Sequence, residues 1–303
     1  MWAFTREALD LLAGCVAEAS ASLSSSSPPP TPKPAAALLA VKEDRYGGVE
    51  VSLGESSTGV EVSTFVDELH GHLDAWLAAD KKGVWLKLPL HAAAFVPPAV
   101  SAGFCFHHAT NDYIQLTRWL PKSPSPLPTY AFTTVGVGGV VVNSAGEVLM
   151  VQEKVSPMPR MQGAWKLAGG LVDRGEDFAE AVAREVMEET GVKTALDGLV
   201  SLRHSHGRRF GQGDLYVVVR LRATSEVIAL NEDELADARW MSKAQIDALR
   251  ETDEDRGLPL AGKISKGNHD MISNALSGAL IEGVQIEDSK GQATMLYRAL
   301  RAS

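Results

Sequence analysis

A glycine-rich turn that leads directly into an acidic helix constrains this chain more than any other feature. Residues 169–192 read GGLVDRGEDFAEAVAREVMEETGV. Glu176 and Asp177 stand at the helix entry, where free backbone amides favour acidic side chains, and Gly191 follows the last helical residues as a C-cap. The pattern therefore predicts a helix from about Asp177 to Thr190.

The predicted helix has an acidic face and an apolar face. Glu185, Glu188 and Glu189 are spaced i, i+3 and i+4, so they share one face. Like charges at this spacing cost a helix about 0.2–0.5 kcal/mol per pair, and a divalent cation removes that cost. Carboxylate oxygens with water suit Mg²⁺ or Mn²⁺, and the stretch has none of the soft ligands that favour zinc. The apolar face consists of Phe178, Ala181, Val182 and Val186.

The spacing of the fixed residues in this stretch resembles the Nudix box. That box reads Gly, five residues, Glu, seven residues, Arg-Glu-aliphatic, one residue, Glu-Glu, one residue and Gly-aliphatic, and every fixed position is filled here. So long a match rarely arises by chance, and it outweighs the alternative of a solvated acidic helix. The chain is identified as a member of the Nudix hydrolases, which implies Mg²⁺-dependent cleavage of a diphosphate bond, with Mn²⁺ as a substitute. The matching residues are Gly170, Glu176, Arg184, Glu185, Val186, Glu188, Glu189, Gly191 and Val192.

The resemblance also implies roles for residues of the box. Glu185 can serve as the general base, Arg184 orients the neighbouring carboxylates, and Glu176 reaches the same network or caps the helix. The i,i+4 spacing of Arg184 and Glu188 makes their contact physically reasonable. The implied metal ligands are the backbone carbonyl of Gly169 and the carboxylates of Glu185, Glu188 and Glu189.

A second candidate for the general base lies downstream of the helix. Some Nudix hydrolases use a helix glutamate as the base and others use a carboxylate from a later loop. Residues 231–236, NEDELA, form such a loop, and Glu232 or Glu234 is the candidate there. A solvated acidic turn explains these residues about equally well, so the choice between Glu185 and this loop stays open.

Substrate identity depends on residues outside the box, because the box handles only the diphosphate. The resemblance implies a nucleoside diphosphate linked to a second group, with ADP-ribose and NADH as the leading candidates. A basic cluster in this acidic chain offers contacts to a second phosphate or to a base, although a solvated loop explains it nearly as well. The candidate substrate-binding residues in the cluster are Arg203, Arg208, Arg209 and Phe210, with His204 and His206 between them.

Composition narrows the class of partner. The chain has 303 residues, 45% of them hydrophobic, and a formal charge of -9. This charge argues against binding to nucleic acid or to an anionic membrane, since both require a basic surface, and favours a small-molecule nucleotide as the partner. The two cysteines, Cys15 and Cys105, form neither a disulfide framework nor a zinc motif, which suits a reducing compartment.

The first 43 residues are predicted to be a disordered tail rich in Ser, Pro and Ala. An organelle transit peptide is the alternative, but Glu7, Asp10 and Glu18 count against it because transit peptides contain few acids. We therefore expect a cytoplasmic protein, and a plastid or mitochondrial one if the tail is a transit peptide. No apolar run is long enough to cross a bilayer.

Residues 44–121 are predicted to form a small α/β domain with a helix from Ser63 to Ala79. Segments of this domain resemble the pre-Nudix domain of eukaryotic Nudix proteins, which is similar to part of an acetyltransferase fold. Neighbouring residues on a strand point to opposite faces, so His107 and His108 are interpreted as packing residues that do not act together. The resemblance implies a role in packing, dimerisation or substrate gating, and we expect a homodimer.

A proline-rich linker over residues 122–129 separates this domain from the second, residues 130–303. For the second domain the resemblance implies the Nudix α/β/α sandwich with a mixed sheet. Its strands include residues 133–142, 148–152, 199–204, 214–221 and 238–241. The last predicted helix covers residues 268–283, and residues 284–288 and 293–300 form a closing hairpin or an extended tail.

Two further functions remain open at this level. A nucleotide-sensing regulatory module would bind without turnover, although such proteins usually lose box carboxylates and this chain keeps all of them. A hydrolase of oxidised nucleotides, RNA caps or coenzyme A would differ only in the shape of its pocket. The acidic charge disfavours a long RNA substrate, and the arginine signature of the coenzyme A branch is not found.

Overall fold

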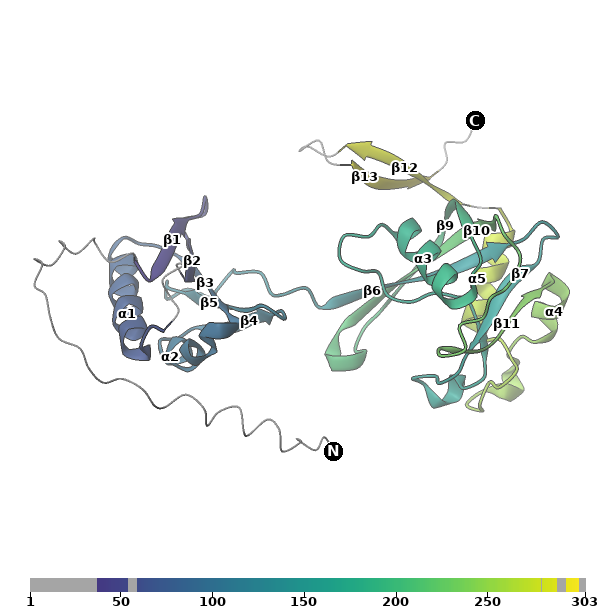
Figure 1. Ribbon diagram of the computed structural model, residues 1–303, viewed down its shortest axis with the longest axis horizontal. Coiled ribbons are helices and arrows are strands. Elements are labelled where there is room, and N and C mark those ends of the chain that lie inside the picture. The colour runs from purple at the N-terminus through teal and green to yellow at the C-terminus, as the bar shows by residue number, and fades with distance from the viewer. Residues whose placement is uncertain (1–36, 54–58, 279, 288–292, 300–303) are drawn as a thin grey trace, which may run out of the picture. The chain divides into compact units, whose positions relative to one another are not determined.

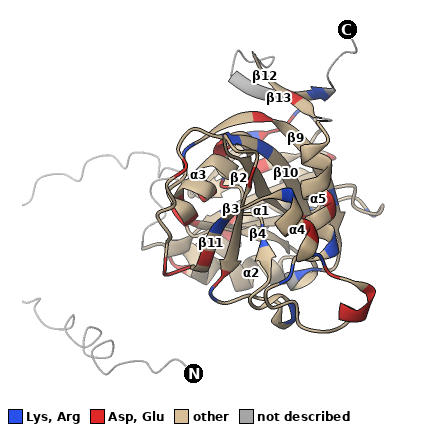
Figure 2. Cartoon of the chain, turned by 90° about the vertical axis from the view of Figure 1, so that its right-hand side faces the viewer, with Lys and Arg blue, Asp and Glu red and all other residues tan. Residues whose placement is uncertain are grey.

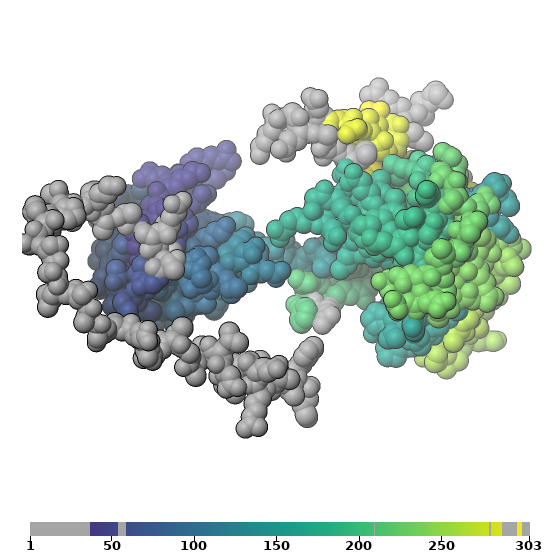
Figure 3. Space-filling model, in the orientation of Figure 1, coloured from purple at the N-terminus to yellow at the C-terminus, as the bar shows by residue number. Residues whose placement is uncertain are grey.

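The computed structural model describes residues 37–53, 59–278, 280–287 and 293–299 (Figure 1). The chain separates into two compact units, Met1–Tyr130 and Ala131–Ser303. In Figure 3 the first unit runs from purple to blue and the second from teal to yellow. Most of the predicted tail lies outside the described residues. Within the described residues, no helix is long and apolar enough to span a membrane.

The first unit contains one five-stranded sheet in the order β1-β2-β3-β5-β4. β2 and β3 are parallel, and the other neighbours are antiparallel. Helix α1 (Val62–Ala78) agrees with the predicted helix to within one residue at each end, and α2 (Val96–Ser101) follows a 3₁₀ segment, η4 (Leu90–Phe95). The strands are β1 (Leu39–Glu43), β2 (Val49–Leu53), β3 (Gly83–Pro89), β4 (Cys105–Ala109) and β5 (Tyr113–Trp119).

Strand β1 lies in the segment that the sequence assigned to the tail, so the first strand begins five residues before the predicted start of the domain at residue 44. Only Leu39 of the five residues is buried, because β1 is an edge strand whose other side chains face solvent. A strand with one buried side chain shows no alternation of apolar and polar residues, and therefore carries no recognisable signal. Its pairing with β2, from Leu39 opposite Leu53 to Glu43 opposite Val49, makes it part of the sheet.

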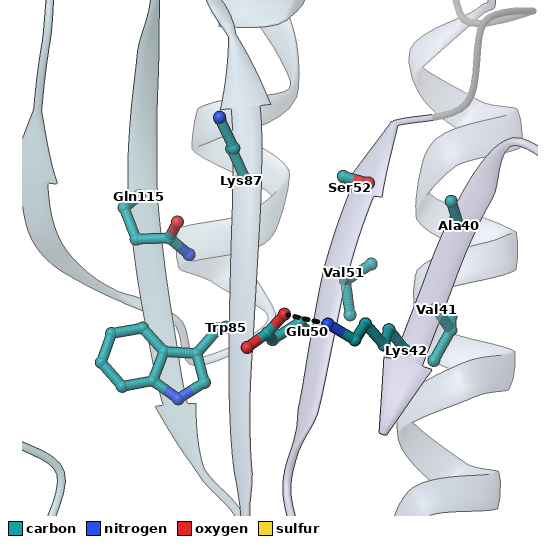
Figure 4. Close-up of a pocket in the computed structure, with 9 residues that line it drawn as sticks. All are labelled: Ala40, Val41, Lys42, Glu50, Val51, Ser52, Trp85, Lys87 and Gln115. Atoms are coloured by element: carbon teal, nitrogen blue, oxygen red, sulfur yellow. Dashed lines mark ion pairs between the residues drawn. The ribbon is translucent and has the colours of Figure 1, made fainter. Parts of the chain in front are cut away.

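The helices of the first unit cover one face of its sheet. Along β3, Val84, Leu86 and Leu88 are fully buried on that face, whereas Lys87 on the other face is exposed. The buried stripe of α1 packs on the same side, and Phe65 stacks on Phe95 with ring centroids 4.5 Å apart. The opposite face, which we call the open face, therefore carries the polar and aromatic side chains of the sheet (Figure 4).

The placement of His107 and His108 differs from the expectation. The pairing of β4 with β5 shifts between Phe106 and His108, so His107 is the extra residue of a β-bulge. The bulge brings the two rings together, with the Nδ1 atoms 2.7 Å apart, and His108 stacks on Tyr130. Alternation of side chains fails at a bulge, and for that reason the prediction of opposite faces was wrong.

The second unit contains an eight-stranded sheet, which is mixed as expected. Its strands follow the order β11-β7-β6-β10-β9-β12-β13, with β8 paired to β7. β6 and β10 are parallel, and the other pairs are antiparallel. The strands are β6 (Thr133–Val142), β7 (Val148–Glu153), β8 (Trp165–Lys166), β9 (Thr194–Ser205), β10 (Gly213–Ala223), β11 (Leu235–Met241), β12 (Ile281–Glu287) and β13 (Ala293–Ala299).

Helices cover both faces of this sheet, which confirms the predicted α/β/α sandwich. Helix α3 (Phe178–Thr190) packs Val182 and Val186 on one face. Helices α4 (Lys243–Ala248) and α5 (Lys266–Leu276) bury Ile246 and Ile272 on the other. Three short 3₁₀ segments complete the unit: η5 (Pro159–Met161), η6 (Arg209–Gly211) and η7 (Asp253–Asp255).

The last helix is shorter than the sequence indicated. Ser265 caps α5 by accepting the amide of Asn268, and the helix ends at Leu276 instead of continuing to residue 283. Gly278 follows with φ at +89°, a conformation that ends the helix. β12 then begins at Ile281 and forms an antiparallel hairpin with β13, so the closing hairpin was predicted but its start was placed too late.

Asp255 stabilises the segment around η7 through three interactions. Its carboxylate pairs with Lys263 and accepts hydrogen bonds from the amide and hydroxyl of Thr252, at 2.8 and 2.9 Å. These partners, the ion pair first, lower the pKa of Asp255 to about 2. Because the unfolded chain has an aspartate pKa of about 3.9, the stabilisation is present above that pH and is lost as the pH falls toward 2.

We therefore expect Asp255→Asn to lower the urea midpoint of unfolding at pH 7. The difference from the natural protein shrinks as the pH approaches 2.5. Asp253→Asn serves as the control. It removes the same charge from an exposed residue that lies two positions before Asp255. A difference that is independent of pH would show that the carboxylate does not act through these partners.

Candidate functional site

The turn that precedes α3 fits its surroundings only because it consists of two glycines. Gly169 has φ at +149°, and a Cβ there would lie 2.1 Å from the carbonyl oxygen of Val137. A Cβ on Gly170 would lie 2.6 Å from the carboxyl carbon of Glu185. The backbone holds the turn against β6, since the amide of Val137 donates to the carbonyl of Gly170 at 2.9 Å. The turn thereby lies directly against the carboxylate of Glu185.

Helix α3 begins and ends as predicted. Asp177 and Glu180 form a capping box at its start, and Gly191 ends it with φ at +67°. Of the predicted apolar stripe only Phe178 is not fully buried, and it stacks on Tyr297 at 5.4 Å between centroids. The acidic residues of α3 are red in Figure 2.

Arg184 joins the carboxylates of the loop to those of the helix. Its guanidinium donates to both oxygens of Glu176, at 2.7 and 2.9 Å, to Glu185 at 2.9 Å and to Glu188 at 3.1 Å. A further hydrogen bond, at 3.1 Å, reaches the carbonyl of Leu171. The bidentate pair with Arg184 lowers the pKa of Glu176 to about 2, helped by the amide of Asp173. Glu176 thus belongs to this network, while Asp177 caps the helix.

Glu189 is the buried carboxylate of the helix, with 6% of its surface exposed. Its carboxylate accepts the amide of Gly169 at 3.1 Å. Burial raises the pKa of Glu189 to about 7, although the positive charge of Lys166 and the Gly169 amide act in the opposite direction. A carboxylate that is costly to ionise by itself is one that a bound cation would stabilise strongly.

A cavity of about 350 Å³ brings these residues together with the end of β7 and the loop before β11. Lys166 pairs with Glu153 at 2.5 Å in its wall. Glu188 does not line the cavity, and its side chain is 56% exposed. The lining residues are Glu153, Lys154, Val155, Lys166, Gly169, Gly170, Glu185, Glu189, Asp233, Glu234 and Leu235.

The end of β7 fixes the acidic loop at the cavity. The amide of Lys154 donates to the carbonyl of Glu234 at 2.8 Å, and its ammonium donates to the carbonyl of Glu232 at 3.0 Å. Glu234 lines the cavity and Glu232 does not, so the structure distinguishes the two downstream candidates by position. Asp233 also lines the cavity and was not among the predicted residues, although it lies between them in sequence.

The donor set of the cavity fits a hard divalent cation in chemistry. It consists of carboxylate oxygens and a glycine turn. Glu189 is buried, and Lys166 and the amide of Gly169 offset only part of the cost of ionising it. In the described part of the chain, no three His, Cys, Asp or Glu side chains lie close enough to hold a metal as they stand. Arg184 takes up oxygens of Glu185 and Glu188, so these carboxylates would have to move toward a cation.

The basic cluster that was predicted to bind substrate does not line this cavity. Arg203 pairs with Asp214 at 3.6 Å and lies over the ring of Tyr216 at 5.0 Å. Arg208 contacts the hydroxyl of Ser205 at 3.4 Å. Phe210 is 83% exposed and has φ at +59°. The side chain of Arg209 lies outside the described residues.

Tyr216 of β10 contacts both the basic cluster, through Arg203, and strand β6, through Gly138. Its pKa is raised to about 12, chiefly by burial. A Cβ on Gly138 would lie 1.9 Å from its hydroxyl, so the ring lies across a strand that must have glycine there. Tyr216 was not selected from the sequence, because alternation in β10 identifies it only as a strand residue.

Comparison with known proteins finds matches for both units. The Nudix hydrolase domain matches residues 39–120, and the NUDIX domain matches residues 132–260. Arabidopsis thaliana Nudix hydrolase 2 is 41% identical over 207 residues, which cover 68% of this chain and 73% of the relative. Arabidopsis thaliana Nudix hydrolase 8 is 41% identical over 69% of this chain and 56% of its own length.

An animal protein and a solved structure are also similar. Mus musculus nucleoside diphosphate-linked moiety X motif 6 is 37% identical over 69% of this chain and 67% of its own length. The crystal structure of the MutT NUDIX hydrolase from Burkholderia pseudomallei is 23% identical and covers 47% of this chain and 97% of that chain, with a TM-score of 0.37.

Proposed function

The chain belongs to the Nudix hydrolase family, whose members cleave diphosphate bonds, and from that premise we propose that it is a Mg²⁺-dependent diphosphatase acting on ADP-ribose or NADH. Its products would be AMP and a phosphorylated remainder. The observation that supports this proposal is the single cavity lined by Gly169, Glu185, Glu189 and Glu234. Turnover requires an intact set of box carboxylates, whereas binding of a nucleotide without cleavage does not require it.

Nudix hydrolases need a divalent metal. We propose that Glu185, Glu188, Glu189 and the carbonyl of Gly169 hold Mg²⁺ here, with Mn²⁺ as a substitute. When bound, the cation would neutralise phosphate oxygens and increase the acidity of a water molecule. Arg184 keeps Glu185 and Glu188 on one side of the helix, and Lys166 offsets part of the negative charge beside Glu189.

A general base must take a proton from the attacking water. We propose Glu234 for this role in preference to Glu185. Glu185 already accepts a hydrogen bond from Arg184 at 2.9 Å, so its carboxylate is partly occupied and less available to a water molecule. Glu234 lines the same cavity, and its backbone is fixed by Lys154.

We propose that the basic cluster contacts the part of the substrate beyond the diphosphate. Arg203 offers its guanidinium over Tyr216, and Arg208 and Phe210 lie in the exposed loop that follows. Arg209 belongs to the same stretch. We further propose that the protein is a homodimer, which light scattering of the full chain would test.

The proposed function is tested with a substrate panel. Release of AMP would be measured from ADP-ribose, NADH, NAD⁺, coenzyme A, FAD and 8-oxo-dGTP with Mg²⁺ or Mn²⁺. Fastest turnover of ADP-ribose or NADH would support the proposal, and fastest turnover of another compound would reassign the substrate. Tight binding without hydrolysis over hours would favour a regulatory module instead.

We expect Gly170→Ala to reduce kcat by about 10²-fold, because it displaces Glu185, a proposed metal ligand, and a misplacement of about 1 Å in a group that positions the reactants has that effect. The new methyl group collides with the carboxylate of Glu185, while φ of Gly170 is outside the left-handed region and the backbone accepts alanine. Gly267→Ala in α5 meets only the tip of Met271, at 3.9 Å, and is the control. If Gly170→Ala turns over normally, Glu185 does not need its observed position.

A further inference from the structure

The open face of the first unit has two adjoining cavities, of about 500 and 540 Å³. Both are lined by Glu50 of β2 and Trp85 of β3, so these two side chains stand between them. Figure 4 shows the first cavity, with Trp85 beside Glu50. Cavities of this volume accommodate small organic ligands. Neither cavity includes any residue of the Nudix box.

The larger cavity has aromatic walls. Its walls include three aromatic side chains, Tyr46, Trp85 and Trp119. Trp119 lies opposite Gly83 in the pairing of β5 with β3, and because Gly83 has no side chain, Leu127 can pack over the strand beside the indole. A Cβ on Gly83 would lie 2.9 Å from Leu127, which belongs to the linker. Every nucleobase has a π-face that can stack on such walls.

The smaller cavity combines polar and charged residues with apolar ones, which are Ala40, Val41, Val51 and Trp85. Lys42 lies 3.9 Å from Glu50 and is otherwise exposed, and Lys87 lies over the ring of Tyr113 at 4.0 Å. Ser52 and Gln115 complete its polar lining. Hydroxyl, amide and ammonium donors together are suited to an anionic oxygen group such as a phosphate.

The balance of charge around the two cavities favours an anion. Lys42, Lys82 and Lys87 line them against two carboxylates, Asp44 and Glu50, in a chain whose formal charge is -9. One oxygen of Asp44 is already engaged by the amides of Tyr46 and Gly48, at 2.7 and 2.8 Å. The three lysines and two carboxylates give the two cavities a net charge of +1, whereas the whole chain carries -9.

We propose that these cavities form a second nucleotide site, which binds a mononucleotide outside the hydrolytic centre. The base stacks in the aromatic cavity on Trp85 and Trp119, and the phosphate lies in the smaller cavity beside Lys42 and Lys87, where Lys42 also offsets the charge of Glu50. The wall that Pro126, Leu127 and Pro128 contribute places the bound base against the linker. Such a site senses a nucleotide without cleaving it, and it does not depend on the proposed substrate.

Photoaffinity labelling with 8-azido-AMP tests this site in the full chain. Peptides would be mapped by mass spectrometry after irradiation, with and without excess AMP. We expect protectable label in the peptides that contain Tyr46, Trp85 or Trp119, in addition to any label within residues 131–303. Label confined to residues 131–303, or label in the first unit that AMP does not reduce, would overturn the proposal.

Two variants separate the contributions of ring and phosphate. Tyr46→Ala, at a side chain that is 71% exposed, is expected to reduce labelling of the first unit at least about fivefold by removing one stacking wall. Lys87→Met should reduce labelling by 8-azido-AMP but not by 8-azidoadenosine, because only the former carries a phosphate. Leu90→Ala, 70% exposed and outside both cavities, is the control, and labelling within residues 131–303 is the internal reference. Equal labelling of all variants would contradict the site.

Discussion

Replacing Glu189 by glutamine is expected to reduce kcat/KM by about 10³-fold or more, which corresponds to about 4 kcal/mol of transition-state stabilisation. Glu189 is the most buried carboxylate of the acidic helix face and lines the cavity beside Gly169 and Glu185. Glutamine has the same shape and keeps an oxygen for the amide of Gly169, but it has no charge to offer a cation. The variant should therefore lose metal affinity as well as turnover.

The same substitution should leave the fold intact. Burial raises the pKa of Glu189 to about 7, so the folded protein without metal opposes its ionisation. A raised carboxyl pKa means that stability declines as the pH rises from the unfolded value, about 4.3, through 7. Glutamine cannot ionise, so in metal-free buffer we expect the melting temperature of the variant to equal or exceed that of the natural protein at pH 8.

Glu180→Gln is the matched control for this experiment. It removes one charge from the same helix at an exposed position, and glutamine preserves the capping box with Asp177. Steady-state rates, Mn²⁺ titration followed by electron paramagnetic resonance, and thermal unfolding would be measured for both variants. Normal Mn²⁺ affinity in Glu189→Gln would show that this carboxylate is not a metal ligand.

The parts of the site that the sequence predicted depend on local spacing. Helix α3 starts at the expected acidic entry, where Asp177 is the cap, and ends as expected at Gly191, because both residues act within one turn of the helix. The contact of Arg184 with Glu188 follows from i,i+4 geometry and is present at 3.1 Å. The individual strands and helices follow from their periodic patterns, whereas the mixed sheet and its two covering layers were expected from the resemblance to the Nudix hydrolases.

The parts that could not be predicted depend on contacts between segments far apart in the chain. Lys166 and Glu153 meet because β8 pairs with β7, and no local pattern specifies that register. The same limitation applies to Asp233, which a loop held by β7 turns toward the cavity. His107 shows a different limit, since a bulge reverses the face that alternation predicts. The basic cluster was selected by charge alone, which does not specify a position relative to the cavity.

The second prediction with a large effect concerns Glu234, whose position at the cavity distinguishes it from Glu232. We expect Glu234→Gln to reduce kcat by about 10²-fold or more with little change in KM, since a general base acts only in the transition state. Glu232→Gln removes an equal charge two residues earlier, where only the backbone carbonyl contacts Lys154 and the side chain does not line the cavity. Its kcat should stay within about twofold of the natural value, as expected for a surface change.

The pH profile and the metal titration distinguish a base from a ligand. If Glu234 is the base, the decline of kcat at low pH is lost in Glu234→Gln, while affinity for Mn²⁺ is unchanged. If Glu234 is instead a metal ligand, Mn²⁺ affinity falls and added metal restores part of the rate. An equal effect of both substitutions would show that the acidic loop acts by its overall charge, and the base would then be assigned to Glu185 on the helix.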